Sequence, residues 1–426
     1  MNSPERASIA ATQLAGLQRL LSELKANRFY APRLSAAQVN APTASMDELR
    51  ATIPFTTKAE LVEDQQRNPP YGTNLTYPLE RYTRFHSTSG TTAAPLRWLD
   101  TAESWQWMLE NWKSVFLAAD VGRRDRAFFA FSFGPFLGFW TAFEAAVQLG
   151  VMCIPGGGLS SAARLRVILD NAATVLCCTP TYALRLAEAA AQSGINLTGQ
   201  PVRTIIVAGE PGGSIPAVRR RIETLWPGAR VFDHHGMTEV GPVTHECPAR
   251  PCCLRVIESS YIAEIIDPRT QKPVGDGEVG ELVLTTLGRI GTPLLRYRTG
   301  DLVRPVYLNE SGDGPGAHLS LDGGILGRAD DMVLIRGVNV YPSAVEEIVR
   351  RDSRVAEYQV EINSSSAMPE LEIKVEPAPE HFGDLSLGAD LAAAFREALA
   401  LRVNVRPVTC GSLPRMEMKS NRWVRK

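Results

Sequence analysis

The sequence lacks a long apolar run and an excess of charge of either sign. Its 426 residues carry 45 Lys and Arg against 46 Asp and Glu, so the formal net charge is −1 and nothing favours a polyanionic partner. A membrane span needs roughly 20 consecutive apolar residues. The best candidate, residues 127–143, is interrupted by Gly134, Pro135 and Gly138. We therefore expect neither nucleic acid nor a membrane as a partner.

Cysteine is scarce, and its count of seven is odd. Such a count in a long chain fits a reducing compartment better than a disulfide framework. Glu5 and Arg6 near the first residue are not part of a charged and then apolar signal region, so we expect no secretion. Apolar residues make up 44% and charged residues 21%, which is ordinary globular usage and excludes disorder on a large scale. These features predict a cytoplasmic globular protein.

Short apolar runs alternate with helical patterns between residues 126 and 239. Strands are expected over residues 126–132, 151–155, 174–179, 204–209 and 230–234, and helices over 161–171, 182–192 and 216–226. This alternation predicts an α/β fold with a mainly parallel, helix-covered sheet. Ligands of such a sheet bind beyond the carboxyl ends of its strands. A further helix is expected within residues 3–29, where leucines recur at helical spacing.

The helical spacing disappears after residue 254. Residues 254–326 are expected to form an antiparallel, β-rich subdomain, with residues 309–324 as its most linker-like part. From residue 330 a smaller pattern of two helices and a small sheet follows, long enough for a core of its own. We predict a large N-terminal domain over residues 1–329 and a small α+β C-terminal domain over residues 330–426.

A hydroxyl-rich segment lies at Ser87-Thr88-Ser89-Gly90-Thr91-Thr92-Ala93-Ala94-Pro95. Its N–H groups and hydroxyls are suited to phosphate oxygens, although such a composition is more often simply a loop. No Gly-Lys-Ser or Gly-Lys-Thr closes the segment, which disfavours a P-loop hydrolase.

A second motif, His235-Gly236-Met237-Thr238-Glu239, follows the fifth expected strand. A carboxylate beside a hydroxyl at this edge of a sheet suits Mg²⁺ that bridges nucleotide phosphates. The alternative is a solvated Glu at a helix start.

The third motif is Arg296-Tyr297-Arg298-Thr299-Gly300-Asp301, with Arg328 following 27 residues later. An Asp can accept both ribose hydroxyls, and an Arg can donate to the same sugar or to a phosphate. Each motif alone is more typical of a surface turn or ion pair.

Taken in order, these motifs resemble those of the acyl-adenylate-forming superfamily, and most closely those of its phenylacetate–coenzyme A ligase branch. Further matching strings run from about residue 54 to the last residues: Pro54-Phe55-Thr56-Thr57-Lys58, Arg84-Phe85-His86, Ala208-Gly209-Glu210-Pro211, Arg336-Gly337-Val338-Asn339-Val340-Tyr341-Pro342 and Leu413-Pro414-Arg415. The resemblance implies an ATP-binding N-terminal domain and a mobile C-terminal domain.

The resemblance also implies a role for individual residues. Ser89, Gly90, Thr91 and Thr92 would clamp the ATP phosphates; Gly209, Glu210 and Pro211 with His234, His235 and Gly236 would border the adenine; Thr238 and Glu239 would meet phosphate and Mg²⁺; and Asp301 and Arg328 would hold the ribose. Asp330 would be the hinge, and Lys419 the mobile lysine of the first half-reaction.

The sequence departs from the family pattern in three places. Ala93 replaces a usual Gly in the phosphate loop, and His235 replaces a usual Tyr. Some relatives hold a structural zinc ion, but the cysteines expected between residues 303 and 327 are missing here. The remaining cluster, His245, Cys247, Cys252 and Cys253, would make a cramped tetrahedron, so we expect free thiols and no zinc.

Residues 128–140 are densely aromatic. Most of this stretch is expected in the core, but the turn after the strand end would line the acyl pocket, with Phe133, Phe136, Gly138 and His235 as its residues. A flat aromatic acid is suited to such walls.

We therefore expect an enzyme that uses ATP and Mg²⁺ to adenylate an aromatic carboxylic acid and then transfers the acyl group to coenzyme A. Two alternatives stay open from the sequence. The acyl group could pass to a carrier-protein thiol or an amine in natural-product biosynthesis, or the chain could be an idle homologue that binds a nucleotide or an aryl acid.

Overall fold

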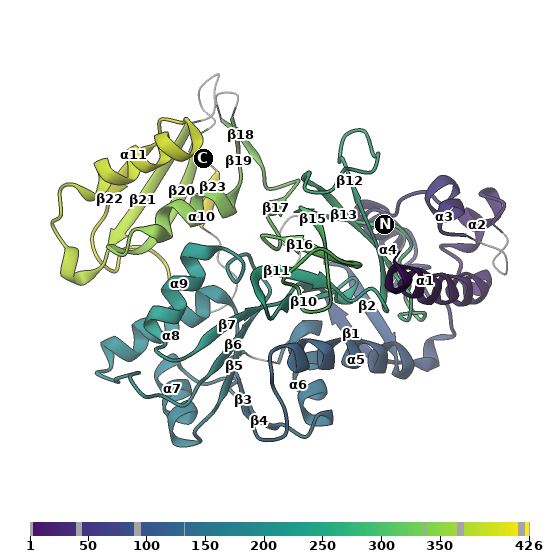
Figure 1. Ribbon diagram of the computed structural model, residues 1–426, viewed down its shortest axis with the longest axis horizontal. Coiled ribbons are helices and arrows are strands. Elements are labelled where there is room, and N and C mark those ends of the chain that lie inside the picture. The colour runs from purple at the N-terminus through teal and green to yellow at the C-terminus, as the bar shows by residue number, and fades with distance from the viewer. Residues whose placement is uncertain are drawn as a thin grey trace. The chain divides into compact units, whose positions relative to one another are not determined.

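A computed structural model describes residues 3–39, 45–88, 95–131, 133–335, 338–363, 370–415 and 422–425 of the chain (Figure 1). The chain forms two compact units. The first unit contains residues 1–158 and 232–325, and the second contains residues 159–231 and 326–426. No helix within the described ranges is long and apolar enough to cross a bilayer.

The first unit begins with short helices: α1 (Pro4–Glu23), η1 (Leu24–Ala26), α2 (Ala31–Ala36), α3 (Met46–Thr52) and α4 (Lys58–Arg67). Ser3 caps α1, because its side chain accepts a hydrogen bond from the N–H of Arg6 at 3.1 Å. Leu17, Leu20 and Leu21 return to one face of α1 and are buried in the main core, as the helical spacing predicts.

An antiparallel hairpin follows, formed by β1 (Tyr82–Ser87) and β2 (Arg97–Thr101) after the short η3 (Leu79–Arg81). The sequence analysis had assigned no strand to these residues. Helix α5 (Ala102–Ala118) begins directly after β2, where the side chain of Thr101 accepts from the N–H of Ser104 at 3.2 Å. The hydroxyl-rich segment thus connects two paired strands.

The α/β elements expected between residues 126 and 239 are present, with ends that differ by a few residues. In the first unit, β3 (Arg126–Phe129) pairs in parallel with β4 (Met152–Pro155). The helix that connects them, α6 (Leu137–Gln148), is not predicted from the sequence, and it contains Gly138, which is predicted to lie in a turn. In the second unit, β5 (Val175–Cys178) pairs in parallel with β6 (Thr204–Val207), accompanied by α7 (Ser161–Asp170), α8 (Pro180–Gln192) and α9 (Pro216–Leu225). All residues of β5 and β6 are buried, as is typical of parallel strands covered on both faces.

The β-rich part of the first unit follows β7 (Arg230–Asp233). It is antiparallel, as predicted, but it begins before the predicted start at residue 254. It contains β8 (Gly236–Met237), β9 (Gly241–Pro242), β10 (Thr244–Cys247), β11 (Arg250–Val256), β12 (Tyr261–Ile266), β13 (Gly280–Thr286), β14 (Tyr297–Val303), β15 (Pro305–Leu308) and β16 (His318–Asp322). The linker prediction for residues 309–324 is wrong in its second half. Strand β16 pairs there with β11 and β15, because Leu319 and Leu321 are buried in the core.

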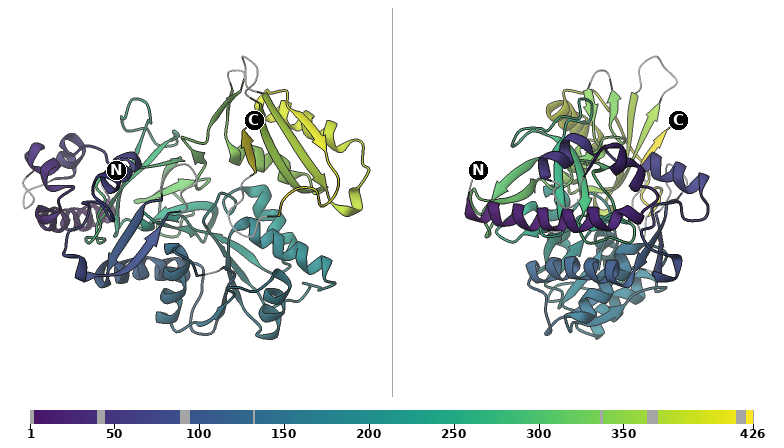
Figure 2. Two further views of the ribbon diagram at one scale, coloured as in Figure 1. Left: turned by 180° about the vertical axis from the view of Figure 1, so that it is seen from behind. Right: turned by 90° about the vertical axis from the view of Figure 1, so that its right-hand side faces the viewer.

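The remainder of the second unit is an α+β fold, as expected for the C-terminal residues. Its elements are β17 (Gly327–Arg328), β18 (Val333–Ile335), β19 (Val338–Val340), α10 (Pro342–Arg351), β20 (Val355–Asn363), β21 (Glu370–Pro377), η4 (Pro379–His381), α11 (Leu387–Leu399), β22 (Asn404–Pro407) and β23 (Trp423–Arg425). The strand order is β22-β21-β20-β23. Helix α11 lies against this sheet (Figure 2, left) and buries Leu387, Leu391 and Phe395 in its core.

Candidate active site

Glu239 is a buried carboxylate in the segment that follows β7, with 5% of its surface exposed. The Nζ of Lys58 lies 3.3 Å from its Oε1. Lys58 is the first residue of α4, which starts at a capping box formed by Thr57 and Glu60. The cap fixes where the helix begins and therefore which residue faces Glu239. The sequence analysis gave Lys58 no role.

A buried ion pair holds the backbone on which Glu239 sits. The guanidinium of Arg289 donates to both carboxylate oxygens of Asp100, at 2.7 and 2.6 Å. Its third nitrogen donates to the carbonyl oxygens of Thr238 and Glu239, at 2.6 and 3.0 Å. Both Arg289 and Asp100 have no exposed surface, so these charge-assisted hydrogen bonds fix the segment rigidly.

Gly236 allows the same segment to fold back on itself. Strands β8 and β9 pair antiparallel, and a Cβ atom at residue 236 would lie 2.8 Å from the carbonyl oxygen of Gly241. A side chain at this position would displace the hairpin. The predicted nucleotide-binding glycine is thus required by the close approach of two backbones.

His235 and Asp301, two predicted site residues, lie together in the first unit. The Nε2 of His235 is 2.9 Å from Oδ2 of Asp301, and the N–H of His235 donates to Oγ1 of Thr244 at 3.0 Å. Asp301 is 4% exposed, and its own N–H donates to Oγ1 of Thr299 at 3.0 Å. The imidazole is therefore a neighbour of the carboxylate that was assigned to the ribose.

His234 is buried beneath this segment. Its Nδ1 donates to the carbonyl oxygen of Thr244 at 2.7 Å, and its ring centroid lies 4.4 Å from that of Trp112. Burial lowers the pKa of His234 to about 3, so its imidazole is neutral at ordinary pH. His234 therefore helps to fix the backbone at Thr244, next to the predicted site residues.

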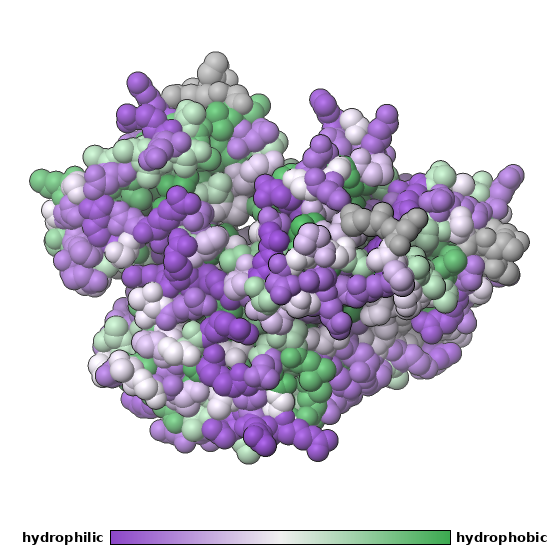
Figure 3. Space-filling model, in the orientation of Figure 1, coloured by the Kyte–Doolittle hydropathy of each residue, from purple (hydrophilic) through white to green (hydrophobic). Residues whose placement is uncertain are grey.

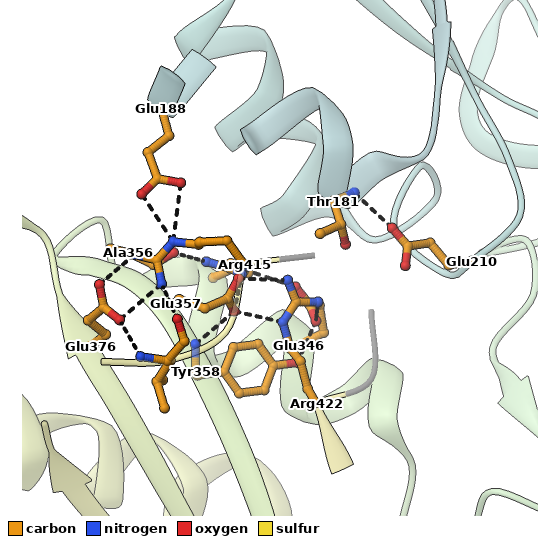
Figure 4. Close-up of polar contacts among 12 residues, drawn as sticks. Thr181, Glu188, Glu210, Glu346, Ala356, Glu357, Tyr358, Glu376, Arg415 and Arg422 are labelled. Carbon is orange, nitrogen blue, oxygen red and sulfur yellow. Dashed lines mark hydrogen bonds and ion pairs between the residues drawn. The ribbon is translucent and has the colours of Figure 1, made fainter. Parts of the chain in front are cut away.

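Gly209, Glu210 and Pro211 follow β6 in the second unit. Gly209 has a φ of 92°, a conformation that favours glycine. Oε1 of Glu210 accepts from the N–H of Thr181 at 2.8 Å, so this carboxylate caps the first turn of α8 (Figure 4). The bond fixes the loop after β6 to the helix after β5.

Arg328 and Asp330, the predicted ribose and hinge residues, pair with each other in the second unit. Nε of Arg328 donates to Oδ1 of Asp330 at 2.8 Å, and a second nitrogen donates to Oδ2 at 3.0 Å. Their side chains are 36% and 59% exposed. An exposed pair of this kind is weak and can open readily.

An aromatic cluster follows β3 in the first unit. Phe131 stacks on Phe139 with ring centroids 4.2 Å apart, and Phe133 contacts Trp140 at 4.8 Å and Phe143 at 5.2 Å. These phenylalanines are half-buried, as is Phe136, and Gly138 is exposed. Hydrophobic surface appears over α6 in Figure 3, where Trp140 is 38% exposed. Helix α6 also contacts β8 and β9, the short strands of the segment between His235 and Val243.

Five predicted residues lie outside the described part of the chain: Ser89, Gly90, Thr91, Thr92 and Lys419. The described flanks of the hydroxyl-rich segment are paired, because the N–H of Thr88 donates to the carbonyl oxygen of Leu96 at 3.0 Å.

The cysteine cluster lies in and beside β10 and β11. Cys247 and Cys253 are buried, and Sγ of Cys247 lies 3.9 Å from Oγ of Ser320. A hydrogen bond from Cys253 lowers the pKa of Cys247 to about 7. His245 and Cys252 are half-buried. Within the described residues, no three His, Cys, Asp or Glu side chains are arranged to hold a metal ion.

Two features of the site were not found from the sequence. Lys58 could have been noticed as a cation directly after a helix cap in one of the matching strings. The pairing of Arg289 with Asp100 spans 189 residues, and no local pattern signals it.

Comparisons with known proteins place this geometry in a family. The chain matches the family described as AMP-binding enzyme over residues 82–288 and the AMP-binding enzyme C-terminal domain over residues 337–426. It is 32% identical to the phenylacetate-coenzyme A ligase of Escherichia coli (strain K12), over 98% of this chain and 95% of that protein. It is 31% identical to the enzyme of the same name from Pseudomonas putida, over 98% and 94%.

A solved structure of 2-hydroxyisobutyryl-CoA ligase in complex with 2-HIB-AMP has the same fold. The two superimpose with a TM-score of 0.92 at 26% identity, over 99% of this chain and 90% of that chain. The matching domains, the curated relatives and the shared fold agree. The chain belongs to the phenylacetate–coenzyme A ligase branch of the acyl-adenylate-forming enzymes, and it is an acid–thiol ligase that uses ATP to join a carboxylic acid to coenzyme A.

Proposed function

We propose that the acid is aromatic, so that the enzyme forms an aryl-adenylate and then an aryl-coenzyme A thioester. The observation that carries this proposal is the half-buried aromatic cluster after β3, which contains Phe131, Phe133, Phe136, Phe139 and Phe143. Aromatic rings prefer edge-to-face or offset contacts with other rings, and such contacts add to the free energy of burial. The names of the curated relatives support the same class of acid.

The location of the cluster supports its assignment as the wall of the acyl pocket. It lies at the carboxyl end of a parallel strand, where ligands of α/β sheets bind. Helix α6, which carries Phe139 and Phe143, contacts the hairpin that begins at Gly236. An acid held there would place its carboxylate on the side of His235, and its ring among the phenylalanines.

Glu239 fits the requirements of a magnesium ligand. It is a buried carboxylate in a rigidly held segment, and its neighbour Lys58 sits at the exposed side of the pair. When bound there together with nucleotide phosphates, Mg²⁺ would supply positive charge to the departing pyrophosphate. Thr238 would contribute its hydroxyl to the same phosphates. Lys58 would hold the carboxylate in place and add a second cation nearby.

The remaining predicted residues take the roles that the family resemblance implies. Asp301, next to His235, would accept the ribose hydroxyls, and Arg328 would donate to the same sugar. Ser89, Gly90, Thr91 and Thr92 would contact phosphate oxygens, and Gly209, Glu210 and Pro211 would border the adenine with His234, His235 and Gly236. Glu210 is already bonded to the N–H of Thr181, so it would act by fixing the shape of its loop.

Charge governs the first half-reaction. A carboxylate oxygen of the acid forms a bond to the α-phosphorus of ATP while the bond from that phosphorus to pyrophosphate breaks. Negative groups approach each other, and negative charge spreads over phosphate oxygens in the transition state. Lys419 would bridge the carboxylate and the α-phosphate and stabilise this charge without a proton transfer.

The second half-reaction needs the same space. The sulfur of the coenzyme A thiolate bonds to the acyl carbon, and the bond between that carbon and the AMP oxygen breaks. A lysine beside the acyl carbon would obstruct the thiol. Rotation about Asp330 would withdraw Lys419, and the weak pair of Arg328 with Asp330 would open when the backbone angles change.

The class of the substrate acid is tested by exchange of labelled pyrophosphate into ATP. The screen covers benzoic, phenylacetic, hydroxylated and amino-substituted aromatic acids, and 2-hydroxyisobutyric acid is the aliphatic comparison. We expect exchange with an aromatic acid and at most weak exchange with the aliphatic one. Preference for the aliphatic acid would contradict the aromatic pocket. No exchange with any acid would favour an idle binding homologue.

The acceptor and the role of Lys419 are tested separately. Added coenzyme A should give a thioester that is detectable by mass, whereas free adenylate without thioester would favour a carrier-protein thiol or an amine as acceptor. Lys419→Ala should lower exchange by about a hundredfold or more and spare thioester formation from supplied adenylate. Equal loss of both half-reactions would contradict the two-position scheme.

A further inference from the structure

Arg415 lies four residues before Lys419 and is held from two sides by carboxylates of the second unit (Figure 4). Its Nε donates to both carboxylate oxygens of Glu188, at 3.1 and 3.3 Å. Its terminal nitrogens donate to the two oxygens of Glu376, one of them at 3.0 Å. The side chain of Arg415 is 20% exposed, so these bonds are partly shielded from water.

The two carboxylates belong to different stretches of the chain. Glu376 is on β21 of the C-terminal fold, and it also accepts from the N–H groups of Gly411 and Leu413, at 2.7 and 3.1 Å. It therefore fixes Arg415 to its own domain. Glu188 is on α8, which belongs to residues 159–231. The bond between Arg415 and Glu188 thus joins the C-terminal fold to the α/β layer.

A second contact joins the same two stretches. Oε2 of Glu347 on α10 accepts from the N–H of Ala217 at 2.8 Å, at the first turn of α9. The N-cap residue of α9, Ile215, has no side-chain hydrogen bond of its own. A carboxylate from the C-terminal fold therefore completes the cap of a helix in the other stretch.

Stability alone does not account for the bond to Glu188. Its side chain is 32% exposed and already has a partner on its own helix, because Arg185 lies 2.9 Å away. Exposed ion pairs contribute little to the free energy of folding. A bond between two stretches of chain that separate when the C-terminal fold rotates has a larger effect on the equilibrium between the two positions of that fold.

We propose that Glu188 is a positioning residue that holds the C-terminal fold, through Arg415, in the position used for adenylation. This inference rests on the proposed function, in which Lys419 acts in one half-reaction and withdraws in the other. Glu376 keeps its bond to Arg415 in both positions. Glu188 and Glu347 lose their partners when the domain turns for thioester formation.

The spacing along the chain fits this assignment. Eight residues separate Glu188 from Pro180 at the start of α8, about 12 Å along the helix axis. At that end of α8, Thr181 binds Glu210 of the predicted nucleotide site. Four residues of chain span at most about 14 Å. The chain length from Arg415 to Lys419 is therefore sufficient to reach this end of α8.

The test compares Glu188→Gln with Arg185→Gln in the full chain. Glu188→Gln keeps the size of the side chain and removes its charge. We expect kcat for ATP–pyrophosphate exchange to fall by about five- to tenfold, with KM for ATP and acid unchanged and with thioester formation from supplied adenylate at or above the wild-type rate. Arg185→Gln removes a partner of Glu188 on its own helix and leaves Arg415 bonded, so both rates should stay within about twofold of wild type.

Two further variants separate positioning from a general loss of structure. Glu188→Lys repels Arg415 and should lower exchange further than Glu188→Gln, again without slowing thioester formation. Glu376→Gln removes the bond that persists in both positions and should slow both half-reactions. Equal losses in both half-reactions for Glu188→Gln, or no loss in either, would overturn the proposal while wild-type exchange confirms the enzyme. Absence of exchange in the wild type would overturn the proposed function and this inference together.

Discussion

Carboxylates in two regions of this protein have different surroundings. In the C-terminal fold, Glu346 and Glu357 are each bonded to both Arg350 and Arg422 at 2.7 to 3.2 Å, and Glu346 also accepts from the hydroxyl of Tyr358 (Figure 4). At the candidate active site, Glu239 is 5% exposed, and within the described residues its ion-pair partner is Lys58 alone.

The two regions differ in how completely their carboxylates are paired with cations. A buried carboxylate is costly unless it is paired and hydrogen-bonded. The C-terminal cluster satisfies this requirement, because each of its carboxylates is bonded to two guanidinium groups. The carboxylate of Glu239 meets one half-exposed ammonium group. The proposed magnesium ion would complete its neutralisation.

The largest expected effect is on the stability of the C-terminal fold, where Glu357 is bonded to Arg350 and Arg422. Glu357→Gln would leave Arg350 and Arg422 buried with too little negative charge, and the free energy of unfolding should fall by about 3 kcal/mol or more. Urea unfolding monitored by circular dichroism measures this. Glu397→Gln on the exposed face of α11 is the control and should change it by less than about 0.5 kcal/mol. An unchanged stability for Glu357→Gln would remove the contrast between the two groups.

Glu239→Gln should lower activity without lowering stability. We expect pyrophosphate exchange to fall by about a hundredfold or more, because a neutral amide no longer attracts a divalent cation, while the midpoint of thermal unfolding stays the same or rises. The exposed residue Glu110 on α5 provides the control, and Glu110→Gln should leave exchange unchanged. A loss of stability with full activity in the folded fraction would show that Glu239 is structural.

Lys58→Met tests the partner of that carboxylate. Exchange should fall by about tenfold, because one cation near the departing pyrophosphate is lost. The free energy of unfolding should fall as well, because the buried carboxylate of Glu239 loses its ion-pair partner. Lys113, which pairs with Glu110 at 2.8 Å on α5, offers a matched lysine that is also in an ion pair. If Lys58→Met and Lys113→Met behave alike, Lys58 has no part in the reaction.

The smallest expected effect is a loss of stability as the pH falls. Burial lowers the pKa of His86 to about 4, below its ordinary 6.5, so the unfolded chain binds a proton first and stability is lost as the pH falls from 6.5. The expected loss is about 1 kcal/mol between pH 6.5 and 5.5. Burial opposes ionisation of Glu357, but Arg350 and Arg422 outweigh it and lower the pKa to about 2, so its contribution to stability is lost only below about pH 4.5.

Hydrogen exchange by mass spectrometry, corrected for the intrinsic rate at each pH, resolves the two windows. Peptides around β1 should lose protection between pH 6.5 and 5.5, and peptides of α10 and β20 should keep theirs. The reverse order would contradict the assignment of charge states in the two regions.

The α/β layer could be predicted from the sequence because its elements carry local signals. Strands β5 and β6 are short apolar runs, and the helices around them begin at Pro or after Ser and Thr caps. The hairpin of β1 and β2 was missed because β1 exposes Phe85 and buries His86, which inverts the expected pattern. Strand β23 was missed because it is short and pairs with β20, some 60 residues away in the sequence.

The candidate site was predictable to the extent that its residues follow strand ends. His235 and Glu239 come directly after β7, and the family resemblance assigned them a role before any contact was known. The contact of His235 with Asp301 depends on the path of the β-rich strands, which periodicity does not specify. The interactions of Arg415 with Glu188 and Glu376 depend on how two separate stretches pack, so no spacing in the sequence indicates them.

The buried pair of Arg289 and Asp100 has a consequence for engineering this enzyme. Asp100 lies on β2, the strand that follows the hydroxyl-rich segment, and Arg289 holds the carbonyl groups beside Glu239. The pair therefore ties β2 to the backbone beside Glu239. If the proposed roles hold, substitutions in the aromatic residues of α6 would change the choice of acid and leave this linkage intact.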